Sequence, residues 1–487
     1  MNHSEETLDP KNWDQTKELA HKMVDDAIDY LQTVRERPVW QQMPDEVIDS
    51  FNSPLPKDPS DLAKVYQKFM ENGYPYPMGN VHPRFWMWYM GSSNFTGAMG
   101  DFMAAIIGSN LGGGNHSAAR IDDQVVDWCR QMVGFPETAS GTLVSGGSMA
   151  NIISLTVARN VMADVDIRKK GVGAITKSLR FYSSDQVHGC HQKGLEILGL
   201  GNEALHKVKS NSNFEVDIDA LKEAIKKDKE AGYKPACIIA NAGTVNTGSI
   251  DDIKAIAEIC KKEEIWFHVD GCIGALIAIA PKYKHLVSGI ELADSIALDP
   301  HKWLHAPFEV GCTIIRNKQD HFNSFATSAE YLEGTKKGIP AAKWLHNYSM
   351  QISRGFRALK VWMSVQEHGI DKFGRLIDQN IEQALYLTES IQVNSNLELV
   401  APTKINIVSF RFVSNTKSEK ELKKINMEIM LQLQETGIAA ISDTTVHEKH
   451  CLRVAICNYR TVRSDLDLLV EQVVKIGNTL INDQILK

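Results

Sequence analysis

Apolar residues in the first part of the chain recur at helical spacing. Between Trp13 and Arg35 the apolar positions are Leu19, Met23, Ile28, Leu31 and Val34. This period predicts an amphipathic helix that ends at Arg37-Pro38, and Asp61–Asn72 is a second helix candidate. Neither segment can form a core of its own, so each must pack on something else.

From about His82 to Gln366 short apolar runs alternate with amphipathic stretches. The strand-like runs are Ala236–Ala240, Ile265–Val269, Ser295–Leu298 and Gly311–Ile315, and the helical stretches include Ile218–Lys229 and Asp252–Lys262. This alternation predicts an α/β domain with a mostly parallel sheet. Functional sites in such sheets gather at the carboxyl ends of the strands.

The pattern changes again from about Gly369. Long helical stretches flank shorter strand-like runs, which predicts a smaller α+β domain at the C-terminus. The helical stretches are Asp371–Val393 and Lys417–Thr436, and the strand-like runs are Ile405–Val413 and Cys451–Cys457. We therefore divide the chain into an N-terminal helical segment (1–81), a large α/β domain (82–368) and a small C-terminal domain (369–487).

Composition excludes several classes of function. The chain has 487 residues, 43% of them hydrophobic, and a net charge of −7 without a basic block, so nucleic-acid binding is not expected. The chain contains no run of about 18 apolar residues, so the sequence predicts no membrane span. The polar, acidic N-terminus does not resemble a secretory signal, and the eight cysteines contain no CxxC pair. These features favour a cytoplasmic, reducing location.

One lysine follows a predicted buried strand. The run Ser295–Leu298 is followed by Asp299-Pro300-His301-Lys302-Trp303. Apolar and aromatic neighbours disfavour the ammonium form of Lys302, and a free lysine amine is a nucleophile toward an aldehyde. A lone lysine after a strand is more often a surface loop residue, so this interpretation depends on other residues.

Three further polar positions also follow predicted strands or precede helices. Asp270 ends the run Ile265–Val269, and a buried carboxylate there needs a cationic or donor partner unless it only caps a turn. Ser145–Ser148 carries two glycines before a helical stretch, which suits an anion site or a plain loop. His188 follows Ser184-Asp185-Gln186, although a lone histidine is often structural.

Together these motifs resemble the group II pyridoxal phosphate (PLP) dependent amino-acid decarboxylases, which include the aromatic-L-amino-acid, histidine and glutamate decarboxylases. Asp299–Trp303 is similar to their cofactor-lysine motif, and the resemblance runs from about Trp13 to the C-terminus. It implies the aspartate aminotransferase-like PLP-dependent transferase fold (fold type I). It also implies PLP as cofactor, no metal, and a homodimer in which the N-terminal segment wraps the partner.

The resemblance also implies roles for the cofactor-site residues. Lys302 would hold PLP, Asp270 would pair with the pyridinium nitrogen, and His188 would lie on the ring and help position the substrate carboxylate. Further matches are Gly147, Ser148 and His301 at the phosphate, with Asn151 in the same pattern, Thr244 or alternatively Asn246 at the phenolic oxygen, and Cys272 at the far ring face.

Other positions either depart from the family pattern or carry weaker assignments. Cys272 stands where a smaller residue is usual, and Asp299 is left out of the phosphate site because an acid would repel the anion. His191 is given no role. Arg354 matches an arginine near the phosphate, and Arg453 and Arg460 are candidates to pair with an anion, although such arginines are more often structural.

The exposed loop Ser328–Pro340 matches the family's mobile lid. Its Tyr331 would protonate the α-carbon after CO2 leaves, and relatives with phenylalanine there produce aldehydes, so Tyr331 favours simple decarboxylation.

The substrate is less well defined by the resemblance. His82–Gly91 is similar to the pocket segment of aromatic decarboxylases, which implies substrate contacts for Trp88, Tyr89 and Met90. However, Asn80 replaces an aromatic residue, and the wall expected from the partner, Gly108–Asn115, contains only glycine, serine, leucine and asparagine. We favour an aromatic L-amino acid. Alternatives are a non-aromatic substrate (histidine, glutamate, aspartate or a diamino acid), another PLP lyase or aminotransferase, or a non-catalytic PLP-binding homologue.

Overall fold

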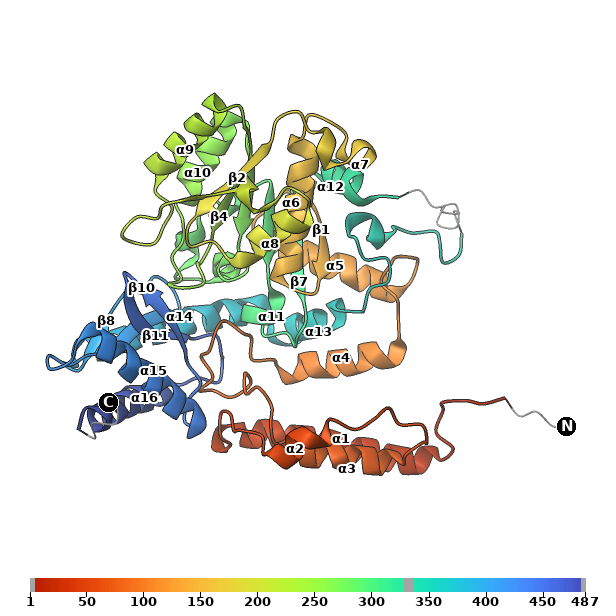
Figure 1. Ribbon diagram of the computed structural model, residues 1–487. Helices are drawn as coiled ribbons and strands as arrows, with labels where there is room; N and C mark the ends of the chain where they lie inside the picture. The colour runs from red at the N-terminus through yellow and green to blue at the C-terminus, as the bar shows by residue number, and fades with distance from the viewer. Residues whose placement is uncertain (1–4, 328–336, 483–487) are drawn as a thin grey trace.

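A seven-stranded sheet forms the centre of the molecule in this computed structural model, which describes residues 5–327 and 337–482 (Figure 1). The strands run in the order β1-β7-β6-β5-β4-β2-β3, and all neighbours are parallel except those of β7. The predicted α/β fold with a mostly parallel sheet is therefore confirmed. The strands are β1 (Ser140–Val144), β2 (Leu179–Ser184), β3 (Leu205–Val208), β4 (Lys234–Asn241), β5 (Trp266–Asp270), β6 (Ser295–Leu298) and β7 (Gly311–Ile315).

Helices cover both faces of this sheet. Along β4, Cys237 and Ile239 pack in a cluster with α6 and α8, whereas Ile238 and Ala240 pack in a second cluster with α5, α9 and α10. Burial on both faces explains why β4 is a continuous apolar run. These helices are α5 (Ser117–Met132), α6 (Gly147–Met162), α8 (Gly189–Ile197), α9 (Ile218–Glu230) and α10 (Ile253–Glu263).

A smaller antiparallel sheet lies beside the large one and has a hydrophobic core of its own. Its order is β10-β11-β9-β8, and three long helices pack with it. The strands are β8 (Leu397–Leu399), β9 (Ile407–Phe412), β10 (Ser442–Val446) and β11 (Lys449–Ala455); the helices are α14 (Ile370–Gln392), α15 (Glu419–Glu435) and α16 (Arg463–Asn482). A capping box between Ser418 and Glu421 fixes the start of α15.

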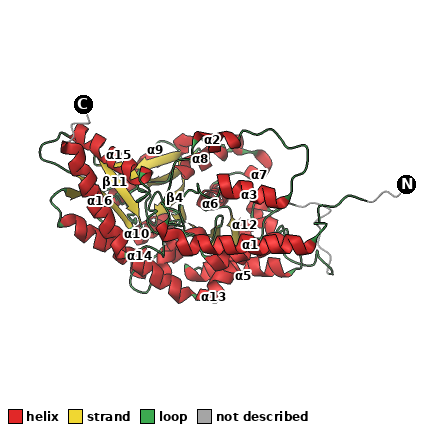
Figure 2. Cartoon of the chain, turned by 90° about the horizontal axis from the view of Figure 1, so that it is seen from below, coloured by secondary structure: helices red, strands yellow, loops and turns green. Residues whose placement is uncertain are grey.

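The N-terminal helices lie below the rest of the molecule (Figures 1 and 2). They are α1 (Trp13–Thr33), α2 (Asp45–Ser50) and α3 (Leu62–Asn72), and α4 (Phe95–Ile107) lies between them and the sheet. The side chains of Asn12 and Asp61 accept hydrogen bonds from the first turns of α1 and α3. Neither α1 nor α3 contains a buried residue, so in this chain they contribute no core.

Most predicted elements are confirmed, with ends that differ by a few residues. The four strand-like runs of the α/β part are β4 to β7, and those of the C-terminal part are β9 and β11. β1, β2, β3, β8 and β10 were not named as strands. The remaining α-helices are α7 (Ile167–Lys170), α11 (Pro300–Trp303), α12 (Lys318–Phe325) and α13 (Ala358–His368).

Two further observations bear on the sequence-based expectations. Within the described ranges, none of the helices combines the length and the apolar character needed to cross a bilayer. All eight cysteines are buried free thiols.

Candidate active site

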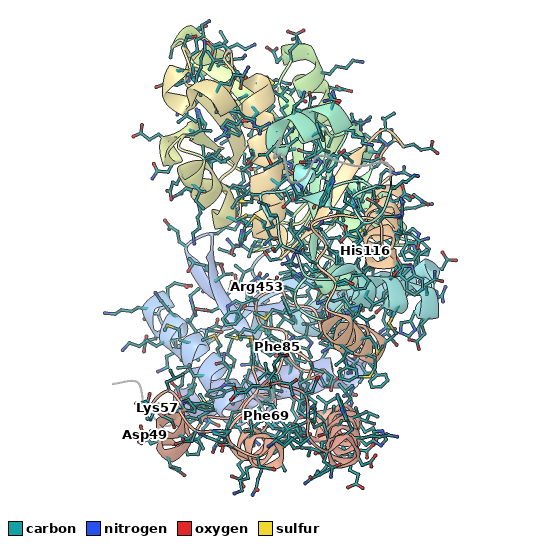
Figure 3. All side chains as sticks on the ribbon, turned by 90° about the vertical axis from the view of Figure 1, so that its right-hand side faces the viewer. Asp49, Lys57, Phe69, Phe85, His116 and Arg453 are labelled. Carbon is teal, nitrogen blue, oxygen red and sulfur yellow. The ribbon has the colours of Figure 1, made fainter. Side chains whose placement is uncertain are left out.

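A cavity of about 670 Å3 lies where β4, β5 and β6 end, between the large sheet and the C-terminal sheet. Figure 3 shows Arg453, one of its lining residues, between these two parts of the molecule. The cavity brings together ten of the residues predicted from the sequence: Trp88, Tyr89, Gly147, Ser148, His188, Thr244, Asp270, Cys272, His301 and Lys302. Asn151 and Asn246 line it as well.

Lys302 is paired with a carboxylate at the inner end of the cavity. The short helix α11 starts directly after β6, so Asp299 and Lys302 lie on one turn, with Lys302 Nζ 2.9 Å from Asp299 Oδ2. Burial alone would lower the pKa of Lys302, but the Asp299 carboxylate, together with Cys272 and Asp270, outweighs burial and raises the pKa. The sequence-based prediction that the ammonium form is disfavoured is therefore wrong for this state of the site.

Asp270 ends β5 and receives hydrogen bonds on both of its oxygens. His191 Nε2 lies 2.8 Å from Oδ2, and the backbone N–H of Cys272 donates to Oδ1 at 3.2 Å. Burial would raise the pKa of Asp270, but the interaction with His191, to which the hydrogen bond from Cys272 and the nearby His268 add, more than offsets burial and lowers the pKa. The carboxylate therefore stays ionised in a buried position.

The start of α6 forms a narrow cradle beside these charges. Gly147 is its first residue, and a Cβ there would lie 2.4 Å from Cys272 Sγ and 2.7 Å from Asp299 Oδ2. Only glycine fits, and the first turn of α6 presents its N–H groups to the cavity with Ser148 exposed beside them. His301 lines the same region, where its Nδ1 accepts a hydrogen bond from the backbone N–H of Val310 at 3.3 Å.

The side chains of His188 and Thr244 make different hydrogen bonds and differ in exposure. His188 caps α8, and its Nδ1 accepts from the N–H of Cys190 at 3.2 Å while the ring remains accessible from the cavity. Desolvation by the surrounding protein lowers the pKa of His188. The Thr244 hydroxyl is buried in contact with Thr247 Oγ1 at 3.0 Å and accepts from Ser249 N–H at 3.1 Å.

The predicted substrate residues separate in space. Trp88 is 48% exposed and lines the cavity, whereas Tyr89 is buried with its hydroxyl bonded to Asn406 and its ring centroid 5.6 Å from Lys302 Nζ. Met90 instead packs beside a cluster formed by Val39, Phe85 and Ala440. The cavity lining found among the described residues does not include Met90.

The three arginines also differ. Arg354 is buried and binds Asp122 and the carbonyl oxygens of Leu111 and Leu143, so it acts as a structural ion pair. Arg460 donates to the carbonyl oxygen of Ser92. Of the three, only Arg453 lines the cavity.

Arg453 connects three separate segments around the cavity. Its guanidinium donates to the backbone carbonyls of Trp88 and Val245 and to Ser442 Oγ.

Tyr331, the predicted proton donor, lies outside the described residues.

Residues 44–413 match the family model described as the pyridoxal-dependent decarboxylase conserved domain. The chain belongs to this family. It is 32% identical to an aromatic-L-amino-acid decarboxylase from Bacillus atrophaeus over 93% of each chain. It is 28% identical to a phenylacetaldehyde synthase from Arabidopsis thaliana, over 93% of this chain and 94% of the relative. The fold is that of Oryza sativa TDC solved with PLP and tryptamine, with TM-score 0.89, 23% identity, and 98% and 100% of the two chains covered.

The donor set of this decarboxylase-family cavity fits PLP. A lysine amine, an ionised buried carboxylate and a helix N-terminus beside a glycine cradle match an aldehyde, a pyridinium nitrogen and a phosphate, respectively. Cys190, His191 and Asp270 also bring three possible metal-ligand atoms within 4.8 Å of one another, but two of these residues are already hydrogen-bonded together.

Sequence reasoning missed His191 and the contact of Asp299 with Lys302. His191 lies one helical turn after His188, and Asp299 precedes Lys302 by three residues. These short spacings are the only signals that the local sequence offers for the two contacts. The contact between His191 and Asp270 joins positions 79 residues apart, so no local pattern predicts it.

Proposed function

We propose that this protein decarboxylates an aromatic L-amino acid to the corresponding amine and CO2 with PLP as cofactor. The observation that carries the proposal is a cavity in which a buried lysine amine and the ionised Asp270 lie at the ends of the adjacent strands β6 and β5. Bound PLP supplies an aldehyde that joins to the lysine and a pyridinium ring that accepts the electrons left when CO2 departs.

Lys302 must lose a proton before its nitrogen can bond to an aldehyde. Asp299 Oδ2, 2.9 Å from Nζ, stabilises the protonated form and opposes that loss. The other oxygen of Asp299 is buried and has no hydrogen-bond partner within the described part of the chain. Asp299 would therefore hold the lysine nitrogen in position.

The other lining residues would hold the cofactor on all sides. The negative charge of Asp270 would stabilise a protonated ring nitrogen, and His188 would cover one ring face and orient the substrate carboxylate. The remaining proposed contacts are Gly147, Ser148 and His301 at the phosphate, Cys272 at the second face, and Thr244, with Asn246 as the alternative, at the phenolic oxygen.

Tyr331 would return a proton to the α-carbon, a role that rests on the sequence match alone. The family resemblance implies that this residue decides the product, because relatives with phenylalanine there produce aldehydes. A tyrosine hydroxyl at this point favours amine formation over aldehyde formation.

An aromatic substrate is supported by the outer wall of the cavity. Trp88 presents a half-exposed indole ring, and the backbone around it is held by Arg453. The name of the Bacillus relative agrees with this substrate class. The inner charges Asp270, Asp299 and Lys302 are already paired or assigned to the cofactor, so they are not available to bind a charged substrate side chain.

We also propose a homodimer with shared active sites. Leu62, Val65 and Phe69 recur along one face of α3 and are 49–55% exposed, and Phe102, Met103, Ile106 and Ile107 of α4 are 44–69% exposed. Such contiguous apolar surface suits a large subunit interface. Gly108–Asn115, directly after α4, would then contribute to the partner's substrate wall.

The domain boundaries and location are proposals as well. We propose a helical dimerisation segment at 1–81, a cofactor-binding domain at 82–368 and a small domain at 369–487, which limited proteolysis would test. We propose a cytoplasmic location, which cell fractionation would test.

The central experiment is a substrate panel with purified protein and added PLP. It would contain the twenty amino acids and several diamino acids, with amine, CO2, aldehyde and hydrogen peroxide all measured. We expect equal amounts of amine and CO2 from tryptophan, tyrosine or phenylalanine. Aldehyde with peroxide, or turnover of only non-aromatic substrates, would contradict the proposal.

Two variants complete this experiment. Lys302→Ala should lose both activity and the visible absorption of bound PLP. Lys360→Ala removes another buried lysine, which binds Asp101 and the carbonyl of Pro307 outside the cavity, and should retain that absorption.

A further inference from the structure

We propose that His191 is a positioning residue that acts on the cofactor through Asp270. Its Nε2–H would fix one oxygen of the Asp270 carboxylate, so that the carboxylate presents its full negative charge to the ring nitrogen of PLP. The proposal rests on PLP occupying this cavity. It assigns a function to a histidine that the motif pattern left without one.

The geometry places His191 directly behind Asp270. His191 lies in the first turn of α8, one turn beyond the cavity-facing His188, and its side chain is fully buried. Nε2 is 2.8 Å from Asp270 Oδ2, while the other oxygen receives the backbone N–H of Cys272. Two donors on two oxygens fix the plane of the carboxylate at the end of β5.

The hydrogen-bonding pattern also indicates the form of the His191 ring. An ionised carboxylate only accepts, so Nε2 must carry the hydrogen. Nδ1 is buried and has no hydrogen-bond partner among the residues that the structure describes. This pattern assigns the donor to Nε2, and a donor there orients the Asp270 carboxylate, which stays ionised.

The neighbouring histidine, His268, cannot take over the hydrogen bond that His191 makes to Asp270. His268 is the nearest aromatic ring, with centroids 6.0 Å apart, but its two nitrogens are bonded to Ser295 Oγ and Asn151 Oδ1. His268 therefore cannot replace His191 as a donor to Asp270. Without His191 the carboxylate would keep one backbone donor in a buried site, where desolvation favours its neutral form.

The test uses the PLP-loaded full-length protein and two substitutions at one position. His191→Leu removes the donor with little change in volume, and His191→Gln can place an amide N–H near the same point. We expect His191→Leu to weaken PLP binding about tenfold, as for loss of a hydrogen bond to a charged group. With 15N-labelled PLP, solid-state NMR should show the ring nitrogen signal moving toward the unprotonated form in His191→Leu and returning in His191→Gln.

A matched control separates this effect from a general loss of packing. His206 Nδ1 and Asp228 Oδ2 form another histidine–aspartate pair of the same 2.8 Å length, between β3 and α9 and outside the cavity lining. His206→Leu should leave PLP affinity and the ring nitrogen signal unchanged. An unchanged signal in His191→Leu, or equal losses in both His191 variants, would overturn the proposal. Failure of the wild-type protein to bind PLP would instead contradict the assigned cofactor site.

Discussion

The inner and outer ends of the active-site cavity are constructed in different ways. At the inner end Asp270 and Asp299 are buried and Lys302 is mostly buried, and each charge has its partner within the same chain. At the outer end Trp88 is 48% exposed and has a left-handed backbone (φ 53°), and its carbonyl is held by Arg453 of the C-terminal sheet.

This difference separates the chemistry from the choice of substrate. The inner end depends on strand ends and helix starts of one rigid α/β layer, which suits a cofactor that must be held without movement. The outer end depends on segments far apart in sequence and, in our proposal, on a second subunit. Changes at the inner end should therefore affect turnover, and changes at the outer end should affect substrate binding.

Asp270→Asn tests the inner end and should have the largest effect. The neutral amide cannot stabilise a protonated ring nitrogen, and loss of such electrostatic stabilisation lowers kcat about 100- to 1,000-fold. The Michaelis constant should change little, because Asp270 lies beneath the proposed position of the cofactor rather than at the substrate wall. Steady-state kinetics with tryptophan or tyrosine would measure both constants. A large rise in KM at unchanged kcat would contradict the division between the two ends.

The inner end was largely predictable from sequence because its residues follow buried apolar runs. Asp270 is the last residue of β5 and Lys302 lies in the helical turn after β6. Both strands have only buried residues, so the meeting of these side chains at one end of the sheet follows from the parallel order. The charge of Lys302 was not predictable from its apolar neighbours. It depends on how α11 turns the Asp299 carboxylate back toward Nζ.

The outer end was less predictable because its contacts are long-range. The turn between β10 and β11 consists of His447 and Glu448, both in left-handed conformations (φ 49° and 61°) without a glycine, so no hairpin signal is present at these positions. Met90 follows Trp88 and Tyr89 in the chain but packs in a different cluster. Its position depends on Val39 and Ala440, which no local pattern connects to it.

Val65→Asp tests whether the outer end needs a partner. A charge in the exposed apolar face of α3 should weaken the proposed dimer about 30-fold or more, as for a central interface residue. Analytical ultracentrifugation would measure dissociation, and we expect turnover to fall with it while the monomer still binds PLP. Lys68→Asp, an exposed polar position on the same helix, is the matched control. If the wild-type protein were monomeric and fully active, a second subunit would not be needed for the outer end of the cavity.

Trp88→Ala tests the substrate wall itself. Loss of the indole face should raise KM for an aromatic substrate about 10- to 30-fold, since one aromatic contact and its buried area are removed. We expect kcat to change by less than about threefold, because an interaction that stabilises the ground state and the transition state equally does not affect kcat. Kinetics with tryptophan and with phenylalanine would show whether the larger ring loses more. A drop in kcat without a change in KM would place Trp88 in the chemistry instead.

Asp299→Asn should have the smallest effect on turnover and a clear effect on pH dependence. In the folded protein Asp299 raises the pKa of Lys302, so at neutral pH the lysine is an ammonium ion, and the fraction of free amine falls about tenfold for each pH unit below that pKa. Asparagine removes the attracting charge, burial then lowers the pKa, and the free amine becomes more abundant at a given pH. The apoprotein variant should therefore capture PLP about tenfold faster at pH 7, and its rate should level off at a lower pH.

Stopped-flow absorbance between pH 6 and 10 would follow this capture. Asp294→Asn is the matched control, because Asp294 flanks the other end of β6 and accepts the backbone N–H of Phe267, away from Lys302. It should leave the pH profile of the wild-type protein unchanged. The same profile in Asp299→Asn and wild type would mean that Asp299 does not control the lysine proton, and the inner end would then owe its charge state to Asp270 alone.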